Sequence, residues 1–238
     1  MLINGWDIAD AKGKQWNVVI GHHSISSNSE WTKGSPVPVM LKNEIGFKTV
    51  EITMLVYGDN RDDILNNRSI ILSHLLTPVD LELDGFLHKF FGILTKCEPE
   101  ETVMNRWHRL TLSFNCYEYA AEITSSFSGS TTITLENPGD ILTPLVVEIT
   151  PQIGAATMTL TGICRDAGTG EDLPVTIKNL VTGEKVILDG ETGLFTQNGA
   201  LTGNIEIWQL PTLLPGENRI TIDNNRMDLR LSFRPRFM

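Results

Sequence analysis

The chain has 238 residues, 41% of them hydrophobic and 20% charged, which is the composition of a globular protein with one large or two modest domains. Its formal net charge is −10, and division at residue 125 leaves −5 on each side, so the sequence lacks the basic footprint of a protein that binds the phosphate backbone of nucleic acids. Three widely spaced cysteines, Cys97, Cys116 and Cys164, indicate buried thiols in a reducing compartment. The N-terminus has no signal-peptide pattern and no apolar run reaches about 18 residues, so we expect neither export by a leader nor a membrane-spanning helix.

The first strands are predicted at 16–20 and 47–57, where the second run alternates apolar and polar residues. Between them, residues 21–46 show no periodicity, and Pro36 and Pro38 favour an extended backbone that cannot pair as a central strand. An irregular stretch of this length is uncommon inside a compact domain. We therefore interpret 21–46 as an interaction arm, with Trp31 exposed in it unless a partner covers the indole.

A helix follows this second strand. Gly58-Asp59-Asn60 provides an N-cap, apolar residues recur at helical spacing from Ile64 to Leu76, and Thr77-Pro78 ends the pattern. A hairpin centred on Asp84-Gly85 and strands at 90–94 and 107–114 complete an α+β module of residues 1–125.

The Ser/Gly-rich stretch 124–130 is the best candidate for a linker. Beyond it, short β-rich runs separated by turn residues predict an antiparallel β-sandwich of jelly-roll type over residues 126–238. These runs are 133–135, 145–149, 158–160, 175–177, 186–188, 205–208, 219–222 and 229–233. The remaining tryptophans, which lie mostly in strand contexts, are expected in the core.

The search for catalytic or metal-binding residues returns little. His22 and His23 point to opposite sides of an extended chain, so they do not form a ligand pair. The run 59–63 lacks the glycine of a calcium loop and fits a helix N-terminus. Asp189 and Glu191 could be a glycosidase pair but are explained more simply as the end of a hairpin. We expect no catalytic residue, metal or cofactor.

The order of several motifs resembles the distal tail proteins of siphophages and of prophages in Gram-positive bacteria. The opening LINGWDI at 2–8, the arm followed by strand and helix, and the closing strand LSFNCY at 112–117 are similar to the first domain of that family. In the second half the resemblance rests on NPGD at 137–140 with TP at 143–144, on ILDGE at 187–191, on WQLP at 208–211 with LPGEN at 214–218, and on FRPRF at 233–237.

This resemblance implies a mainly β fold with two domains. The N-terminal domain, residues 1–125 with a belt arm at about 21–46, would form a hexameric ring, and a galectin-like sandwich, residues 126–238, would follow. The ring would join the tail tube to a tail-associated fibre or lysin at the tail tip, with receptor-binding proteins at its periphery, without specific nucleic-acid binding or membrane insertion. Trp31, Pro36, Pro38 and Phe47 are the expected interface residues.

The turn Pro138-Gly139-Asp140 is interpreted as a joint that starts the second domain and helps to set its angle. Two other functions remain open. A carbohydrate-binding module for host cell-wall glycan is the alternative, and an enzyme acting on glycan through Asp189 and Glu191 is the third.

Overall fold

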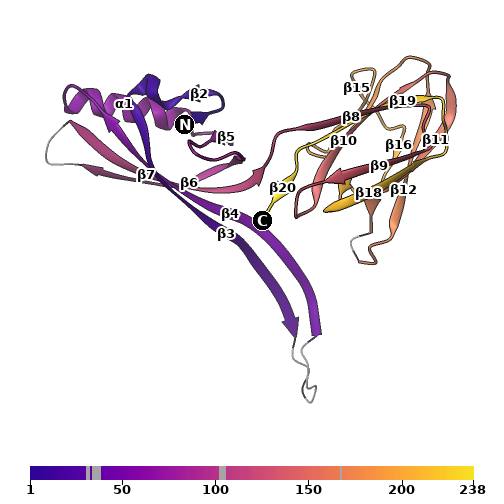
Figure 1. Cartoon of the computed structure of the whole chain (residues 1–238), viewed down its shortest axis with the longest axis horizontal. Helices are drawn as coiled ribbons and strands as arrows, with labels where there is room; N and C mark the ends of the chain where they lie inside the picture. Colours follow the sequence, from indigo (N-terminus) through magenta and orange to yellow (C-terminus); the bar gives the residue numbers. More distant parts are fainter. Residues whose placement is uncertain (31–32, 34–38, 102–105, 167) are drawn as a thin grey trace. The chain divides into compact units, whose positions relative to one another are not determined.

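The computed structural model describes residues 1–30, 33, 39–101, 106–166 and 168–238. Its internal contacts divide the chain into two compact units, Met1–Tyr119 with Met238, and Ala120–Phe237. Strands dominate both units, their pairings are antiparallel, and the described residues contain one α-helix (Figure 1). The prediction of a mainly β protein with one helix is confirmed.

The first unit is built on one long sheet. The order across it, from one edge to the other, is β2 (Trp6–Asp7), β1 (Leu2–Ile3), β5 (Val79–Glu82), β6 (Lys89–Glu101), β7 (Trp107–Tyr119), β4 (Val39–Tyr57) and β3 (Gly13–Glu30). Side chains alternate between the two faces, and along β4 the residues Val50, Ile52 and Met54 are fully buried. This alternation is the pattern predicted for 47–57.

Helix α1 (Arg61–Ser73) and the 3-10 helix η1 (Ile8–Ala11) belong to the core on this inner face. The backbone N–H of Asp63 donates to Oδ1 of Asn60 at 2.9 Å, which is the N-cap that the sequence indicates. Ile64 and Ile71 of α1 are fully buried. The helix ends earlier than predicted: Leu75 is buried beyond its last turn, whereas Leu76 is exposed.

The arm at 21–46 differs from the prediction of an irregular segment. Strands β3 and β4 stay paired from Gly13↔Val56 out to Glu30↔Val39, with several register shifts, so the arm is a two-stranded ribbon (Figure 1). The pattern was not visible in sequence because Ser24, Ile25 and Ser26 are all exposed there. Backbone hydrogen bonds hold the ribbon without a buried face to impose alternation.

The second unit contains two sheets. One has the order β15 (Ala200–Leu201), β14 (Phe195–Gln197), β13 (Val186–Asp189), β10 (Thr143–Pro151), β19 (Met227–Phe233) and β8 (Ile123–Ser128), with β17 (Thr212–Leu213) also on β10. The other has the order β16 (Ile205–Glu206), β12 (Asp172–Leu180), β11 (Ala155–Arg165), β18 (Gly216–Ile222) and β9 (Thr132–Asn137). A last short strand is β20 (Arg236–Phe237).

A single apolar core in this unit draws residues from both sheets, including Val147 of β10, Leu231 of β19 and Ile177 of β12. Every β-rich run predicted between 133 and 233 contains strand residues. The expected linker at 124–130 is wrong in part, because Ile123–Ser128 forms strand β8, paired with β19 from Ile123↔Phe233 to Ser128↔Asp228. Its serines occupy an edge strand while Phe127 packs against the core, so composition alone suggested a linker.

Candidate assembly interface

Phe47 is the one predicted interface residue within the described part of the chain; Trp31, Pro36 and Pro38 lie outside it. Phe47 is in β4 with 59% of its surface exposed. Its neighbour Lys48 points to the inner face and is buried, so Phe47 is on the outer face of the first sheet.

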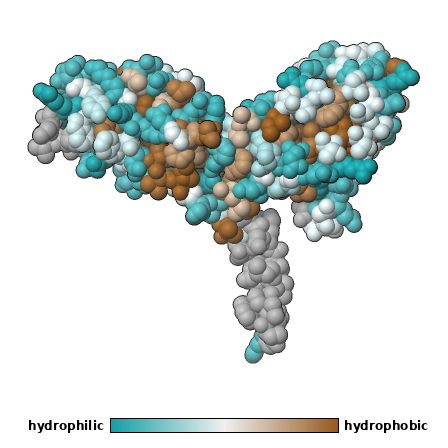
Figure 2. Space-filling view, in the orientation of Figure 1, coloured by the Kyte–Doolittle hydropathy of each residue, from teal (hydrophilic) through white to brown (hydrophobic). Residues whose placement is uncertain are grey.

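The outer face of this sheet carries further apolar side chains. Val19 of β3 and Ile93 of β6 are 53% and 49% exposed. Val19 is opposite Glu51 in the register, and Ile93 is opposite Asn115 of β7. Apolar residues gather in the region where β4, β6 and β7 run side by side (Figure 2). Among the described residues, α1 and η1 pack with the inner-face residues in the core.

Small polar and aromatic residues also lie on this outer face, together with charged side chains such as Glu51. Thr49 of β4 and Thr95 of β6 are exposed, and Ser113 of β7 is half-buried. The rings of Phe91 and Tyr117 contact each other with centroids 5.5 Å apart. Apolar groups interspersed with short hydroxyl side chains make a surface that another protein can approach closely.

The ribbon carries a second apolar feature. Ile25 and Ile45 are a cross-strand pair, 63% and 50% exposed. β3, which has 18 residues, is also an edge strand in the order of this sheet. Along its outer edge, no strand of that order pairs with its backbone N–H and C=O groups. An edge of this kind can accept a strand from another chain.

A buried charge cluster fixes the base of the ribbon. Lys48 Nζ donates to Glu118 on β7, and His88 Nδ1 lies 2.5 Å from the other oxygen of that carboxylate. Burial alone would raise the pKa of Glu118, but the hydrogen bonds from Lys48 and His88 outweigh it and lower the pKa below the ordinary value. Nearby, His23 Nδ1 is hydrogen-bonded to the carbonyl of Gly46. These contacts tie β3, β4 and β7 and the β5–β6 loop together at the base of the ribbon.

The predicted joint residues Pro138, Gly139 and Asp140 lie between β9 and β10. The side chain of Asn137, which is 1% exposed, organises them. Its Oδ1 accepts from the backbone N–H of Gly139 at 3.1 Å, and its Nδ2 donates to Thr143 Oγ1 at 3.2 Å. The turn is therefore held from within by a buried amide.

The same turn binds the C-terminal segment of the second unit. The backbone N–H of Asp140 donates to the carbonyl of Arg236 at 3.1 Å, and the N–H of Arg236 donates to Thr143 Oγ1 at 3.2 Å. The N–H of Ala120, the first residue of this unit, donates to the carbonyl of Pro235 at 2.9 Å. The segment at 235–236 thus connects the turn to the point where the chain enters the unit. That the turn sets a domain angle stays a prediction.

Asp189 and Glu191 are arranged as the end of a hairpin. Asp189 Oδ1 accepts from the backbone N–H groups of Glu191 and Thr192 at 2.8 and 3.0 Å. Glu191 lies 3.8 Å from a guanidinium nitrogen of Arg236 beside a hollow of about 190 Å³. The Asp189 carboxylate is committed to the turn, which favours the structural interpretation of this pair.

Other candidates from the sequence give no chemical site within the described residues. No group of three metal-ligating side chains is found there. Burial raises the pKa of the Cys116 and Cys164 thiols to about 12, which makes them poor nucleophiles at neutral pH. Nor does any helix in the described ranges have the length and apolarity to cross a membrane.

The expectation of a core position is wrong for two tryptophans. Trp16 and Trp208 are 64% and 81% exposed, although their strand contexts predicted a core position. Trp16 lies at a register shift of β3, which frees its side chain from the alternation. Trp208 lies two residues after the end of the two-residue strand β16, outside its pairing with β12. By contrast, Trp6 is half-buried and stacks on His74 at 4.1 Å.

The structure is that of a mainly β protein with two compact units, the first of which carries the ribbon. The chain shares its fold with the Dit protein of phage SPP1. The TM-score is 0.78 at 15% sequence identity, and the match covers 100% of this chain and 98% of that one. The SPP1 protein is described as a paradigm of the hub adsorption apparatus in phages that infect Gram-positive bacteria. The phage P2 baseplate in its activated, calcium-bound conformation gives a TM-score of 0.54 at 8% identity, covering 97% and 92%. The strontium-bound form gives 0.52 at 9% identity, covering 95% and 92%.

The predicted resemblance is thus confirmed at the level of the fold. No protein-family model matches the sequence, and no curated protein matches it.

Proposed function

We propose that the chain is a distal tail protein, a structural component of a phage or prophage virion at the tip of the tail. The observation that carries the proposal is the match to the SPP1 hub protein over 100% of this chain and 98% of that one. A match of this extent includes both units and the ribbon. It is therefore more specific than a likeness between two β-sandwich domains, which many unrelated proteins share. The galectin-like character of the second unit and its boundary near residue 125 belong to the same proposal.

The first unit would assemble as a homo-hexameric ring. A ring closed by head-to-tail contacts needs two different, complementary surfaces on each subunit. One is the outer sheet face with Val19, Phe47 and Ile93, and the other is the ribbon with Ile25 and Ile45 and the open edge of β3. The ribbon of one copy would pair with or cover the next copy, and Trp31, Pro36 and Pro38, which lie outside the described residues, would contribute to that contact.

The ring would connect the tail tube to the tail-associated fibre or lysin and to the host-adsorption device, with synthesis in the bacterial cytoplasm. It would act without catalysis. The formal net charge of the chain is −10. This negative charge would prevent DNA from binding to the ring while it passes through the lumen. The joint at Pro138, Gly139 and Asp140 would hold the second unit in a defined orientation relative to the ring.

The experiment is light scattering with negative-stain microscopy on the purified chain and on tails of the phage that encodes it. We expect rings with a mass near six copies of the 26.5 kDa chain. The double variant Phe47→Ser, Ile93→Ser should lose assembly while the single chain stays folded, because both side chains are exposed in the single chain. Leu87→Ser is the matched control, since Leu87 is 99% exposed but lies in the β5–β6 loop and not in a strand of the sheet. A monomer that is also missing from purified tails contradicts the proposal.

Carbohydrate binding is the alternative, and one feature of the second unit favours it. A hollow of about 390 Å³ on the sheet of β8, β19 and β10 is lined by polar groups that suit sugar hydroxyls, among them Ser126, Glu148, Lys185 and Arg230. Host cell-wall glycan should then raise the melting temperature of a monomeric chain, because a ligand of the native state stabilises it. Ring formation without any such shift favours the structural role.

A further inference from the structure

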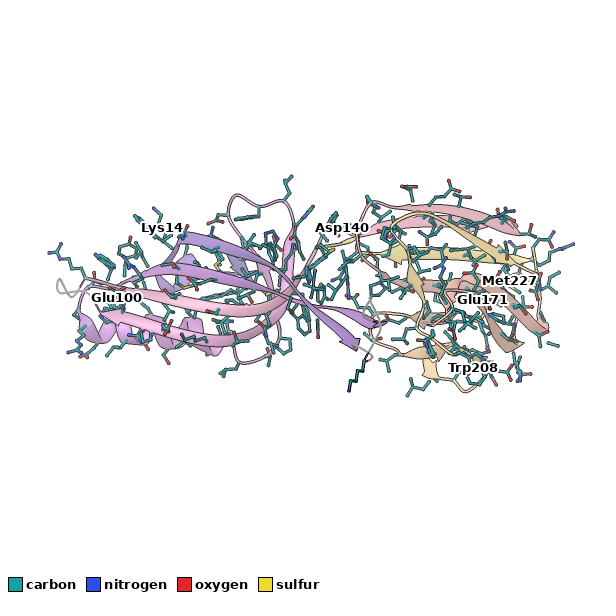
Figure 3. The ribbon with its side chains drawn as sticks, turned by 90° about the horizontal axis from the view of Figure 1, so that it is seen from below. Lys14, Glu100, Asp140, Glu171, Trp208 and Met227 are labelled. Carbon is teal, nitrogen blue, oxygen red and sulfur yellow. The ribbon has the colours of Figure 1, made fainter. Side chains whose placement is uncertain are left out.

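Five exposed apolar residues of the second unit lie around the segment that joins β16 to β18. We call them the Leu/Trp rim: Leu142, Leu194, Trp208, Leu210 and Leu214, which are 55%, 54%, 81%, 46% and 39% exposed. Trp208 lies at the periphery of the unit (Figure 3). Its indole alone presents on the order of 200 Å² to solvent.

The four leucines of the rim form two close pairs, and Trp208 lies on the same chain segment as one leucine of each pair. Thr143 is opposite Leu213 in the β10–β17 register, which places Leu142 and Leu214, one residue further on, at the same end of this pair. The side chain of Leu210 lies 3.6 Å from the position that a Cβ atom would take at residue 193, next to Leu194. Trp208 and Leu214 are six residues apart in the chain, so their Cα atoms are within about 20 Å of each other.

The backbone beneath these side chains is fixed. Leu145 N–H donates to the carbonyl of Pro211 at 3.0 Å, and the thiol of Cys164 donates to the carbonyl of Gln209 at 3.1 Å. Gly190 approaches Pro211 so closely that a side chain there would meet its carbonyl oxygen. These contacts restrain the backbone beneath the rim, which lowers the entropic cost of binding.

Carboxylates lie beside the rim. Glu217, three residues after Leu214, is directly opposite Glu136 in the β18–β9 register, and both are exposed. Two like charges facing each other across strands repel, and although Arg219 follows on the same face, a further cation on a partner would reduce this repulsion. The second unit as a whole has eight basic and fourteen acidic residues, a formal net charge of −6.

We infer that the Leu/Trp rim is a docking surface for a different protein, one that offers an apolar pocket for Trp208 framed by lysine or arginine side chains. The four leucines favour an apolar protein surface over a sugar, whose hydroxyls need polar side chains next to the aromatic ring. A second copy of this unit would bring Glu136 and Glu217 against further carboxylates, so charge favours a heterologous, basic partner. An exposed tryptophan on a rigid backbone is the type of residue that dominates binding energy at such surfaces. This inference does not depend on ring formation by the first unit.

The test places a photo-crosslinking amino acid, p-benzoylphenylalanine, at position 208 of the full chain in cells that carry the native neighbouring genes. The control carries the same group at Leu201, which is also exposed, at 74%, but lies outside the rim on β15. Crosslinked peptides are identified by mass spectrometry. Glu136→Lys with Glu217→Lys is combined with the probe to test the charge requirement.

We expect one protein to crosslink at 208 and not at 201, through a peptide that contains lysine or arginine beside apolar residues. The charge reversal should reduce this product at least tenfold. Crosslinks to another copy of the chain, to glycan, or equally from both positions overturn the inference, as does the absence of any product at 208. Ring formation is measured separately by light scattering. A negative crosslinking result therefore does not contradict the proposed function, and a chain that forms no ring does not contradict the docking surface.

Discussion

Replacement of Gly139 by alanine tests how tightly the turn between β9 and β10 binds the C-terminal segment. A methyl group at this position would lie 2.5 Å from the carbonyl oxygen and 2.9 Å from the nitrogen of Arg236. Both atoms belong to backbone and cannot move aside as a flexible side chain would. Gly139→Ala must therefore separate the turn from residue 236.

The cost follows from the hydrogen bonds that this separation breaks. Asp140 N–H loses the carbonyl of Arg236, and Arg236 N–H loses Thr143 Oγ1, which is buried. At about 1 kcal/mol for each bond, and more where a polar group stays buried without a partner, the loss is about 2–4 kcal/mol. At roughly 4 °C per kcal/mol, the melting temperature of the second unit should fall by about 8–16 °C.

Calorimetry measures the melting temperature, and hydrogen exchange reports the amides of Ala120 and Asp140, which should lose protection together. Gly203→Ala is the matched control, because no atom lies within 4 Å of its added methyl group and its φ is not in the left-handed region. The control should change stability by less than about 0.5 kcal/mol. A Gly139→Ala protein that melts like the wild type with a protected Asp140 amide would refute the reasoning.

Three further outcomes are expected. Asn60→Ala removes the cap of α1 and should destabilise the first unit by about 1 kcal/mol in urea denaturation, whereas Asn66→Ala, exposed within the same helix, should not. Because the pKa of Glu118 is lowered in the folded state, its ionised carboxylate stabilises the fold above the ordinary carboxyl pKa of 4.5, and this stabilisation is lost as the pH falls through the lower folded-state pKa. Glu118→Gln should therefore make the urea midpoint fall less steeply in acid. A decline as steep as that of the wild type would contradict this expectation. Cys116 and Cys164 should resist a thiol reagent at about pH 8 until urea unfolds the chain, because burial raises the pKa of both thiols to about 12, and rapid labelling of the native protein would show that burial is incomplete.

Local signals in the sequence were sufficient to predict those helices and strands that bury one face in the core. The cap at Asn60 and the alternation along β10, with Leu145, Val147 and Ile149 inward, can be read directly from the sequence. The ribbon around Ile25 could not be predicted, because a two-stranded element exposed on both faces imposes no periodicity on its residues.

The candidate surfaces were predictable only in part. Phe47 was expected at an interface and is exposed, whereas Val19 and Ile93 were missed because they come from strands that only the sheet pairing makes neighbours. Trp208 was missed for a related reason, since its exposure depends on where pairing stops after Glu206. Long-range register, which no single stretch of sequence encodes, determines which side chains meet on a face.

The position of β19 has a consequence for folding on the ribosome. This strand, Met227–Phe233, lies between β10 and β8, and its pairing with β8 joins Ser128 to Asp228, 100 residues apart. The first half of this sheet must therefore wait for nearly the whole chain to be synthesised, at about 5–20 residues per second. The long pairing of β3 with β4 is by contrast local and can form as soon as residue 57 has emerged. The first unit can thus fold while the second is still incomplete, so a chain that stops before β19 would carry a formed first unit and an open sandwich with unpaired strands.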